Sequence, residues 1–231
     1  MIVGNGQLAQ VFKDCNNDDT CIFASGVANS NCQDEAEFER EKKLLIKHLE
    51  ENVDKKFVYF SSCALSAPEY QKNEYYMHKE KMEELIKEYS ENYYIFRIPQ
   101  LFGKLKDHKT LINFLYESVL KGNSFKVYSD AYRYVIEIED VRKLVESYLS
   151  FSKPNITVDL ANPYRYKVLE IVQIFEDLLN KKANYEIIKK EDLYELNLSE
   201  LLNFIEKNEV CVEFSEKYLK NKLQEKIKES N

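Results

Sequence analysis

The sequence predicts an α/β fold in which helices flank a mostly parallel sheet. Short apolar runs alternate along the chain with longer amphipathic stretches, which is the pattern of strands joined by helices. Residues 57–60 are apolar at every position, as expected for a strand that is buried on both faces. Two glycines, Gly4 and Gly6, follow the first apolar run and precede a helical stretch, where a strand-to-helix turn is expected.

The first half of the chain predicts four strands and three helices. The first strand ends at Gly4, and the polar residues 16–19 form the turn before the second strand. Within 37–50, apolar residues share one face among charges, as in a surface helix. Pro99 ends the fourth strand, because proline has no N–H to donate to a sheet. The predicted strands are 1–3, 21–25, 57–60 and 93–98, and the predicted helices are 7–14, 37–50 and 74–89.

The second half continues the alternation. A predicted helix over 110–120 is followed by Lys121 and Gly122, and a glycine in that position commonly ends a helix. The remaining predicted strands are 125–128, 134–138, 157–160 and 185–188, and the remaining helices are 139–151, 167–180 and two near the C-terminus.

Length and composition exclude several classes of protein. A chain of 231 residues forms one large domain, or one domain with a smaller appendage. The net charge of −7 disfavours nucleic acid as a partner. The apolar runs are too short to span a membrane and the first residues resemble a strand, so we expect a cytoplasmic protein without a membrane partner. Five cysteines without a C-x-x-C pair suggest neither a disulfide framework nor a zinc site.

Two motifs follow the first and third predicted strands. Gly4, Gly6 and Ala9 have the spacing of a turn whose backbone approaches a pyrophosphate at a helix N-terminus, although an ordinary strand-to-helix turn has the same residues. Ser62 ends the buried strand, where a hydroxyl would face the crevice at the carboxyl edge of the sheet. The same serine would also serve as a helix cap or a turn residue.

The third motif is a tyrosine and a lysine on one predicted helix. Tyr75 and Lys79 are four positions apart, which puts both on the same helix face. An ammonium beside a phenol lowers the pKa of the phenol, as an acid–base catalyst needs. With 17 tyrosines in the chain, such a pair also arises by chance.

In this order, the motifs resemble the extended short-chain dehydrogenase/reductase family, whose members act on nucleotide sugars with a nicotinamide cofactor. Residues 4–9 are similar to the family's glycine turn, in the variant of the dTDP-4-dehydrorhamnose reductases, and 57–64 resemble its serine strand. Residues 75–79 match its catalytic pair. Residues 97–103 resemble the segment at the nicotinamide end, and 127–141 resemble a segment of the substrate domain.

The resemblance implies a role for each matching residue. Tyr75 would exchange a proton with the sugar oxygen that Ser62 binds, and Lys79 would lower the pKa of Tyr75 and hold the nicotinamide ribose. Arg133 would bind the substrate diphosphate through its two-pronged guanidinium. The cofactor, NAD or NADP, would contact Gly4, Gly6, Gln7, Leu8, Ala24, Ser25, Lys79 and Pro99. The nucleotide-diphosphate sugar would contact Ser62, Gln100, Tyr128 and Arg133.

The family resemblance also implies an organisation and an activity. A Rossmann-like cofactor domain would cover 1–104 and return over about 130–150, and a smaller α/β substrate domain would cover 105–129 and 151–231. A homodimer would form through 37–50 and 74–89. The implied activity is keto-sugar reduction, epimerisation or dehydration in surface-polysaccharide precursor synthesis. The alternatives are a cofactor-less nucleotide-sugar-binding or regulatory protein, and a structural domain with chance motifs.

Two features depart from the family pattern. One residue is missing from the first gap of the glycine turn, and Ala9 replaces its last glycine. Only eleven residues separate Ala9 from Cys21, and the strand at Cys21 resembles the family's fourth. The second and third strands, which hold the adenosine, would then be absent, and a right-handed crossover would shift the first helix to the other sheet face. The alternative is that residues 21–25 are the second strand.

Histidines and the strand-end cysteine receive simpler interpretations. His78 lies between the two predicted catalytic residues and is expected at the surface. His48 and His108 lack the spacing of metal ligands, and no metal site is expected. Cys63 is expected to be a buried packing residue.

Overall fold

A computed structural model describes residues 1–15, 18–106 and 110–230, which form two compact units. Unit 1 consists of Met1–Ile98, Val141–Leu160 and Leu196–Cys211, and unit 2 consists of Pro99–Asp140, Ala161–Glu195 and Val212–Asn231. These bounds differ from the expected division. Residues 99–104 and 130–140 lie in unit 2, and residues 151–160 and 196–211 lie in unit 1.

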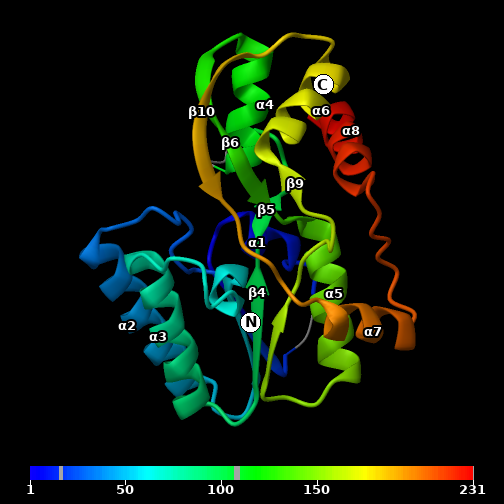
Figure 1. Cartoon of the computed structure of the whole chain (residues 1–231). Helices are drawn as coiled ribbons and strands as arrows, with labels where there is room; N and C mark the ends of the chain where they lie inside the picture. Colours follow the sequence, from blue (N-terminus) through cyan, green and yellow to red (C-terminus); the bar gives the residue numbers. More distant parts are fainter. Residues whose placement is uncertain (16–17, 107–109, 231) are drawn as a thin grey trace. The chain divides into compact units, whose positions relative to one another are not determined.

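Unit 1 contains a five-stranded sheet with the order β1-β2-β3-β4-β8, and all of its strand pairs are parallel. Figure 1 shows helices packed around it. The predicted α/β class is therefore confirmed. The strands are β1 (Ile2–Val3), β2 (Thr20–Phe23), β3 (Lys56–Ser62), β4 (Tyr93–Ile98) and β8 (Ile156–Asp159).

The first strand is an edge strand. Ile2 of β1 pairs with Ile22 of β2, and β2 pairs on its other side with β3. In the common dinucleotide-binding order 3-2-1-4-5-6, strand 1 lies inside the sheet and strand 4 is its neighbour. Here β2 is the neighbour of β1, and no strand within the described ranges pairs with the outer edge of β1. The sheet consequently has no point at which the strand order reverses.

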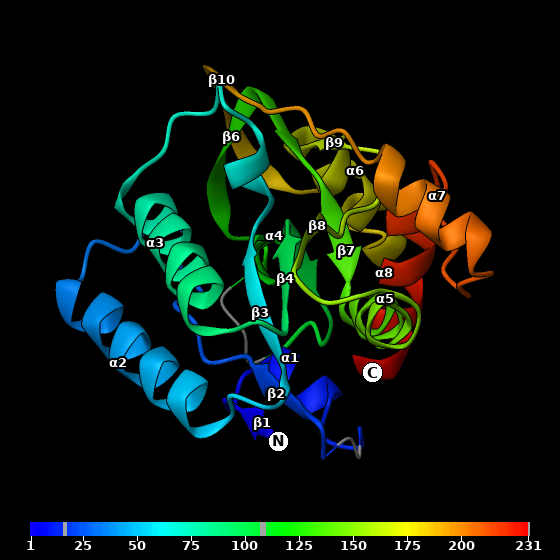
Figure 2. The ribbon, with the colours of Figure 1, turned by 90° about the horizontal axis from the view of Figure 1, so that it is seen from below.

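Helices cover both faces of this sheet (Figure 2). Tyr59 of β3 packs in a cluster with Leu45 and Met82, so α2 and α3 lie on its face. The next residue, Phe60, points to the other face, where its ring lies 5.8 Å from that of Phe12, just after α1. The helices of unit 1 are α1 (Gln7–Val11), α2 (Glu35–Glu51), the 3₁₀ helix η1 (Cys63–Ser66), α3 (Glu74–Tyr89), most of α5 (Ile138–Phe151) and α7 (Ser199–Lys207).

The first two crossover connections have opposite hands. Both β1–α1–β2 and β2–α2–β3 step across the sheet in the same direction, but α1 and α2 pass over opposite faces. One of the two connections therefore departs from the usual right-handed rule. Accordingly, α1 does not share the sheet face of α2 and α3.

Within its described residues, unit 2 has two small sheets and three complete helices around its own core. Strands β5 (Gln100–Phe102) and β7 (Val135–Glu137) pair in parallel. The second sheet has the order β10-β6-β9, from β10 (Asn184–Asp192), β6 (Ser124–Arg133) and β9 (Tyr166–Lys167). Its core includes Ile112, Val127 and Ile171, all almost fully buried. The helices are α4 (Leu111–Lys121), α6 (Val168–Leu179) and α8 (Tyr218–Ser230).

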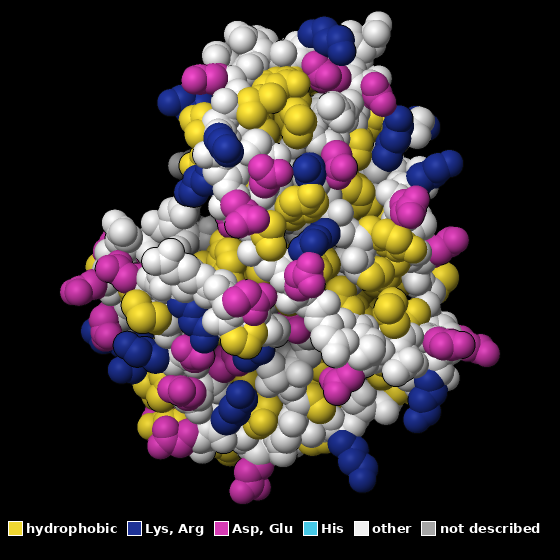
Figure 3. All heavy atoms as spheres, in the orientation of Figure 1, with side chains coloured by type: hydrophobic (Ala, Val, Ile, Leu, Met, Phe, Trp, Pro, Cys, Tyr) yellow, Lys and Arg dark blue, Asp and Glu magenta, His cyan; other side chains and the backbone are white. Residues whose placement is uncertain are grey.

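The surface carries both basic and acidic side chains, as expected for a chain with 33 Lys and Arg and 40 Asp and Glu residues. Figure 3 shows basic and acidic side chains interspersed on the visible face of the molecule, without a large patch of one sign. Within the part of the chain that the structure describes, no helix combines the length and the apolar character that crossing a bilayer requires.

Candidate functional site

The glycine turn brings the end of β1 against the end of β2. Gly4 has a φ of +129°, and a Cβ built on it would lie 2.4 Å from the carbonyl oxygen of Ala24. Gly6 is the N-cap of α1 with ordinary φ, and a Cβ built on it would meet open space, with nothing within 4 Å. No side chain caps this helix. The predicted cofactor residues Gln7 and Leu8 begin α1 and are partly exposed, as are Ala24 and Ser25.

The two glycines are expected to respond differently to alanine. Gly4→Ala places a side chain at a φ that costs about 1–3 kcal/mol of strain, with a steric clash against Ala24 in addition. Gly6→Ala is the matched control: its Cβ meets open space at an ordinary φ, so it should cost only the N-cap preference for glycine over alanine, about 0.5–1 kcal/mol. Urea unfolding followed by circular dichroism measures both values. Equal stability of the two variants would contradict this account of the turn.

Tyr75 and Lys79 lie near each other on α3, and both are buried. The Lys79 ammonium lies 5.8 Å from the centroid of the Tyr75 ring and 5.0 Å from that of Tyr59. Its hydrogen bonds go elsewhere: Nζ donates to Glu41 Oε1 at 3.0 Å and to the Tyr59 hydroxyl at 3.0 Å. The predicted catalytic lysine is therefore part of a buried polar cluster.

Glu41 is the centre of this cluster. Its side chain is fully buried, and it accepts hydrogen bonds from the Tyr59 hydroxyl at 2.6 Å and from the Val27 N–H at 2.6 Å. His78 Nε2 lies 3.1 Å from Glu41 Oε2, and Lys79 completes the set. A buried carboxylate is tolerated only when it is paired and hydrogen-bonded in this way. We name Glu41, Tyr59, His78 and Lys79 the Glu41 cluster.

The cluster determines how the acidic groups ionise. Burial alone would raise the pKa of Glu41, but the Lys79 charge and the hydrogen bonds from His78 and Tyr59 hold that pKa well below its usual value. Burial, followed by the negative charge of Glu41, raises the pKa of Tyr75. The expectation that Lys79 lowers the pKa of Tyr75 is therefore wrong. The physical reason is that the lysine charge is matched by a carboxylate 3.0 Å away.

Two serines at the end of β3 behave differently. The hydroxyl oxygen of Ser62 accepts a hydrogen bond from the Ala64 N–H at 3.4 Å, so Ser62 caps η1. Ser61 is buried, and its hydroxyl has no partner in the described part of the chain. Because side chains alternate along a strand, Ser61 shares the face of Tyr59. The sequence places Ser61 beside Ser62 at the end of this strand, and Ser61 is thus the unsatisfied hydroxyl on the side of the Glu41 cluster.

A second cluster of hydrogen-bonded polar side chains connects the carboxyl ends of β3, β4 and β8. Arg97 binds Glu83 through two hydrogen bonds of 2.9 and 2.7 Å, and it also donates to Ser66 at 2.9 Å. Ser66 donates to Asp159 at 2.8 Å. Cys63 is fully buried and its pKa is raised by burial, so it remains a thiol at neutral pH. These contacts connect the ends of the three strands through side-chain hydrogen bonds.

The predicted substrate residues and Pro99 lie in unit 2, except Ser62. Arg133 does not present a free guanidinium: its Nη2 donates to Asp192 at 2.5 Å, and its Nη1 donates to the backbone oxygen of Tyr132 at 2.7 Å. The Tyr128 ring is covered by the Lys190 ammonium at 4.6 Å. Gln100 begins β5, where its N–H donates to the carbonyl of Tyr134.

Sequence reasoning missed Glu41 and misplaced His78. His78 is buried, and its ring stacks on Phe38 at a centroid distance of 4.6 Å, so the expected surface position is wrong. The sequence positions of both residues nevertheless indicated burial. Glu41 precedes Leu45 by four positions, and His78 precedes Met82 by four, so each lies on the buried stripe of its helix. His108 lies outside the described residues, and within them no group of three His, Cys, Asp or Glu side chains is arranged to hold a metal ion.

Comparisons with known proteins place this geometry in context. No protein-family model matches the sequence, and no curated protein matches it. Solved structures do match. RMD from Pseudomonas aeruginosa, solved with NADPH, has a TM-score of 0.73 at 14% identity, with 92% of this chain and 81% of that chain covered.

Two further structures have the same architecture. UDP-glucuronic acid 4-epimerase from Bacillus cereus, solved with NAD, has a TM-score of 0.74 at 16% identity, with 98% of this chain and 78% of that chain covered. dTDP-glucose 4,6-dehydratase from Bacillus anthracis, also with NAD, has a TM-score of 0.73 at 14% identity, with 97% and 76% covered. The chain thus has the Rossmann-like fold of these enzymes.

Proposed function

We propose that the chain is a nucleotide-sugar oxidoreductase or epimerase that uses NAD or NADP. The observation that supports this most is that one fold, shared over 92–98% of the chain with nucleotide-sugar enzymes, carries Tyr75 and Lys79 together on α3. The comparison structures contain NAD or NADPH, and related ones contain UDP-glucuronic acid or UDP. A nicotinamide cofactor and a nucleotide-diphosphate sugar are therefore the proposed ligands.

The glycine turn fits the pyrophosphate of such a cofactor. The close approach of Gly4 to Ala24 and the open space around Gly6 leave bare backbone at the start of α1, and no side chain caps the first-turn N–H groups. Gly4, Gly6, Gln7, Leu8, Ala24, Ser25 and Pro99 would hold the cofactor, with Lys79 toward the nicotinamide ribose. The cofactor, when bound, supplies the hydride chemistry.

The remaining chemistry is a proton transfer at Tyr75. Because burial and Glu41 raise the pKa of Tyr75, its hydroxyl stays protonated at neutral pH. A protonated phenol donates to a carbonyl oxygen that gains a hydride, so the site suits reduction of a keto sugar. Ser62 and the unsatisfied Ser61 are candidates to bind the same oxygen.

Further parts of the proposal concern partners and cellular role. All of the proposed cofactor residues except Pro99 belong to unit 1. For Arg133, which belongs to unit 2, we propose that it exchanges Asp192 for the substrate diphosphate. A groove between α2 and α3, lined by Phe38 and Met77 among charged residues, supports the proposed homodimer. Analytical ultracentrifugation, which gives the mass of the particle in solution, tests the homodimer.

The proposed cellular role is the synthesis of surface-polysaccharide precursors in the cytoplasm.

A second candidate is a protein that binds nucleotide sugars without a cofactor. It is favoured by one observation, that Lys79 and Arg133 both engage carboxylates of the chain itself. A fluorescence titration with NADH and NADPH separates the two functions. Saturable enhancement at millimolar cofactor or below supports the oxidoreductase. No enhancement, together with measurable binding of UDP or dTDP, supports the second candidate.

The adenosine half of the cofactor gives the cofactor proposal a sharper test. The acidic residue that binds the adenosine ribose normally lies about 20 residues after the glycine turn. Here Ala24 and Ser25, which follow β2 at that distance, are not acidic. Reduced nicotinamide mononucleotide, which lacks the adenosine half, should therefore bind with a Kd within about threefold of that of NADH. Calorimetric titration measures both. NADH binding about 100-fold tighter would show that the chain holds the adenosine by other means.

A further inference from the structure

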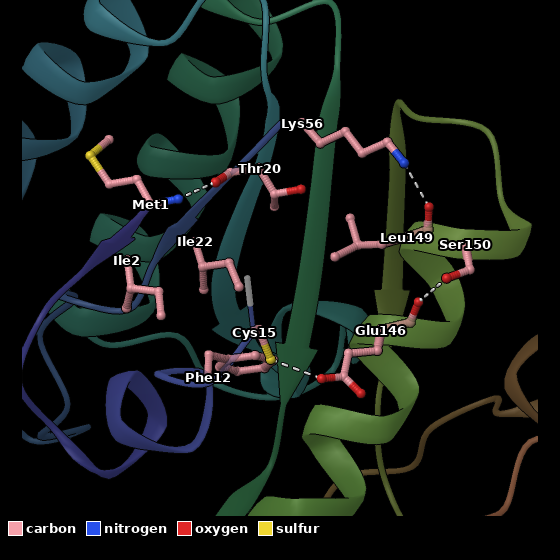
Figure 4. Close-up of a pocket in the computed structure, with 10 residues that line it drawn as sticks. All are labelled: Met1, Ile2, Phe12, Cys15, Thr20, Ile22, Lys56, Glu146, Leu149 and Ser150. Carbon is pink, nitrogen blue, oxygen red and sulfur yellow. Dashed lines mark hydrogen bonds between the residues drawn. The ribbon is translucent and has the colours of Figure 1, made fainter. Parts of the chain in front are cut away.

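A cavity of about 330 Å³ lies within unit 1, on the face covered by α1 and α5 (Figure 4). Thr20 and Lys56, the first residues of β2 and β3, line it. It is therefore at the N-terminal end of the strands, whereas the glycine turn and Ser62 follow their carboxyl ends. The helix on this side, α1, has five residues and spans only about 7.5 Å.

At one end of the cavity, a hydroxyl and an ammonium group lie close together, and neither is paired with a carboxylate of the described residues. Thr20 and Lys56 are register partners in neighbouring strands, so their side chains lie side by side on one face. Thr20 is 2% exposed, and its hydroxyl has no partner among residues 1–15, 18–106 and 110–230. The Lys56 ammonium donates to the Leu149 carbonyl at 2.7 Å, and no carboxylate of these ranges forms an ion pair with it. An unmade hydrogen bond of a buried hydroxyl costs about 1–3 kcal/mol.

At the other end of the cavity, the polar side chains already have hydrogen-bond partners within the protein, and the walls are largely apolar. Cys15 Sγ donates to Glu146 at 2.8 Å, and Arg142 also binds that carboxylate at 3.1 Å. Burial and the Glu146 hydrogen bond raise the pKa of Cys15 to about 11, so it is a thiol and not a nucleophile at neutral pH. Figure 4 shows Lys56 and Thr20 at the upper end and Cys15 and Glu146 at the lower end. The walls between these ends include the apolar side chains of Phe12, Ile22 and Leu149.

We propose that this cavity binds a small organic anion, a carboxylate with an aliphatic or aromatic body. The carboxylate would lie against the Lys56 ammonium and the Thr20 hydroxyl, which supply the two missing interactions. The apolar body would replace water along Ile22 and Leu149, where burial of apolar surface is favourable. The site is separate from the glycine turn and from Tyr75, and it does not depend on the proposed enzymatic activity.

The test uses benzoate as a probe of the full chain. Calorimetric titration should give saturable binding, and ¹⁵N NMR should show shifts at Thr20, Ile22 and Leu149. Benzamide has the same shape without the charge, and it should bind about tenfold more weakly, since a hydrogen bond to a charged group contributes about 1.5–3 kcal/mol. Inorganic phosphate, which has charge but no apolar body, should also bind about tenfold more weakly.

Variants assign the binding to the two polar residues. Lys56→Met should weaken benzoate binding by about tenfold or more, and Thr20→Val by a smaller factor. Lys55→Met is the matched control, because Lys55 is the chain neighbour that does not line the cavity. Circular dichroism confirms that each variant is folded. The proposal is overturned if benzoate does not bind, if benzamide or phosphate binds equally well, if Lys56→Met binds benzoate unchanged, or if the NMR shifts cluster at Ser25 and Tyr75.

Discussion

Replacing Tyr75 by phenylalanine is expected to lower turnover by about 10²–10⁴-fold, the usual contribution of a general acid–base group. The substitution removes only the hydroxyl, and this hydroxyl forms no hydrogen bond to Ser62 or Lys79. Packing of the ring on α3 should therefore persist, and the Kd for the nucleotide-diphosphate sugar should stay the same. Steady-state kinetics with a keto sugar and NAD(P)H, beside calorimetry, measure the two quantities.

A matched control and two serine variants show whether a loss of turnover is specific to the Tyr75 hydroxyl and which serine acts with it. Tyr89→Phe removes a hydroxyl from the exposed C-terminal end of the same helix and should leave turnover unchanged. Ser61→Ala and Ser62→Ala distinguish which serine binds the sugar oxygen, because only that variant should lose turnover. Wild-type turnover by Tyr75→Phe would remove the catalytic assignment from this tyrosine.

Removing the carboxylate of Glu41 is expected to have the largest effect on stability. Glu41→Gln leaves Lys79 charged and nearly inaccessible to water, and breaking a buried pair in this way costs about 3–5 kcal/mol. Guanidinium unfolding measures the change in the free energy of unfolding. Glu37→Gln on the same helix is the control, because the half-exposed Glu37 pairs with Arg40 at the surface and should contribute about 0–1 kcal/mol.

A double variant separates the charge from the packing. Glu41→Gln with Lys79→Met removes both charges while keeping similar volumes, so it should recover much of the stability lost in Glu41→Gln. If the double variant were less stable than the single one, the unpaired lysine charge would not be the cause of the loss. The amide oxygen of the glutamine can accept from the Val27 N–H at the position of Oε2, and its NH₂ group, at the position of Oε1, can donate to the Tyr59 hydroxyl.

The same cluster predicts an acid-dependent stability. The pKa of Glu41 is lower in the folded protein than in the unfolded chain. The carboxylate therefore contributes its stability above the ordinary glutamate pKa, and this contribution is lost progressively as the pH falls below that value. Between neutral pH and pH about 3, the double variant should lose less stability than the native chain. Equal slopes would show that Glu41 does not carry this dependence.

Most of the secondary structure could be predicted because its determinants are local. Predicted strands and helices such as 57–60 and 74–89 correspond to β3 and α3, and Pro99 follows the end of β4 as expected. The Glu41 cluster could not be predicted in the same way. Its members come from α2, β3 and α3, and only the tertiary packing decides that a glutamate and a lysine 38 residues apart form one buried ion pair.

The site residues show the same limit. The spacing of Tyr75 and Lys79 correctly predicted that they share one helix, but it did not indicate that Glu41 would neutralise the lysine. Likewise, the pairing of Arg133 with Asp192 joins β6 to the end of β10, and the intervening 58 residues carry no local pattern for it. The periodicity of apolar residues therefore cannot predict which polar side chains pair when they are far apart in the sequence.

The brevity of β1 also bears on how the molecule behaves in concentrated solution. An outermost strand normally displays a row of unused amide and carbonyl groups on which a neighbouring molecule can build another strand. Ile2 and Val3 provide such groups over only two positions. Within the described residues, the unpaired edge of β1 is therefore only a short template for intermolecular sheet growth.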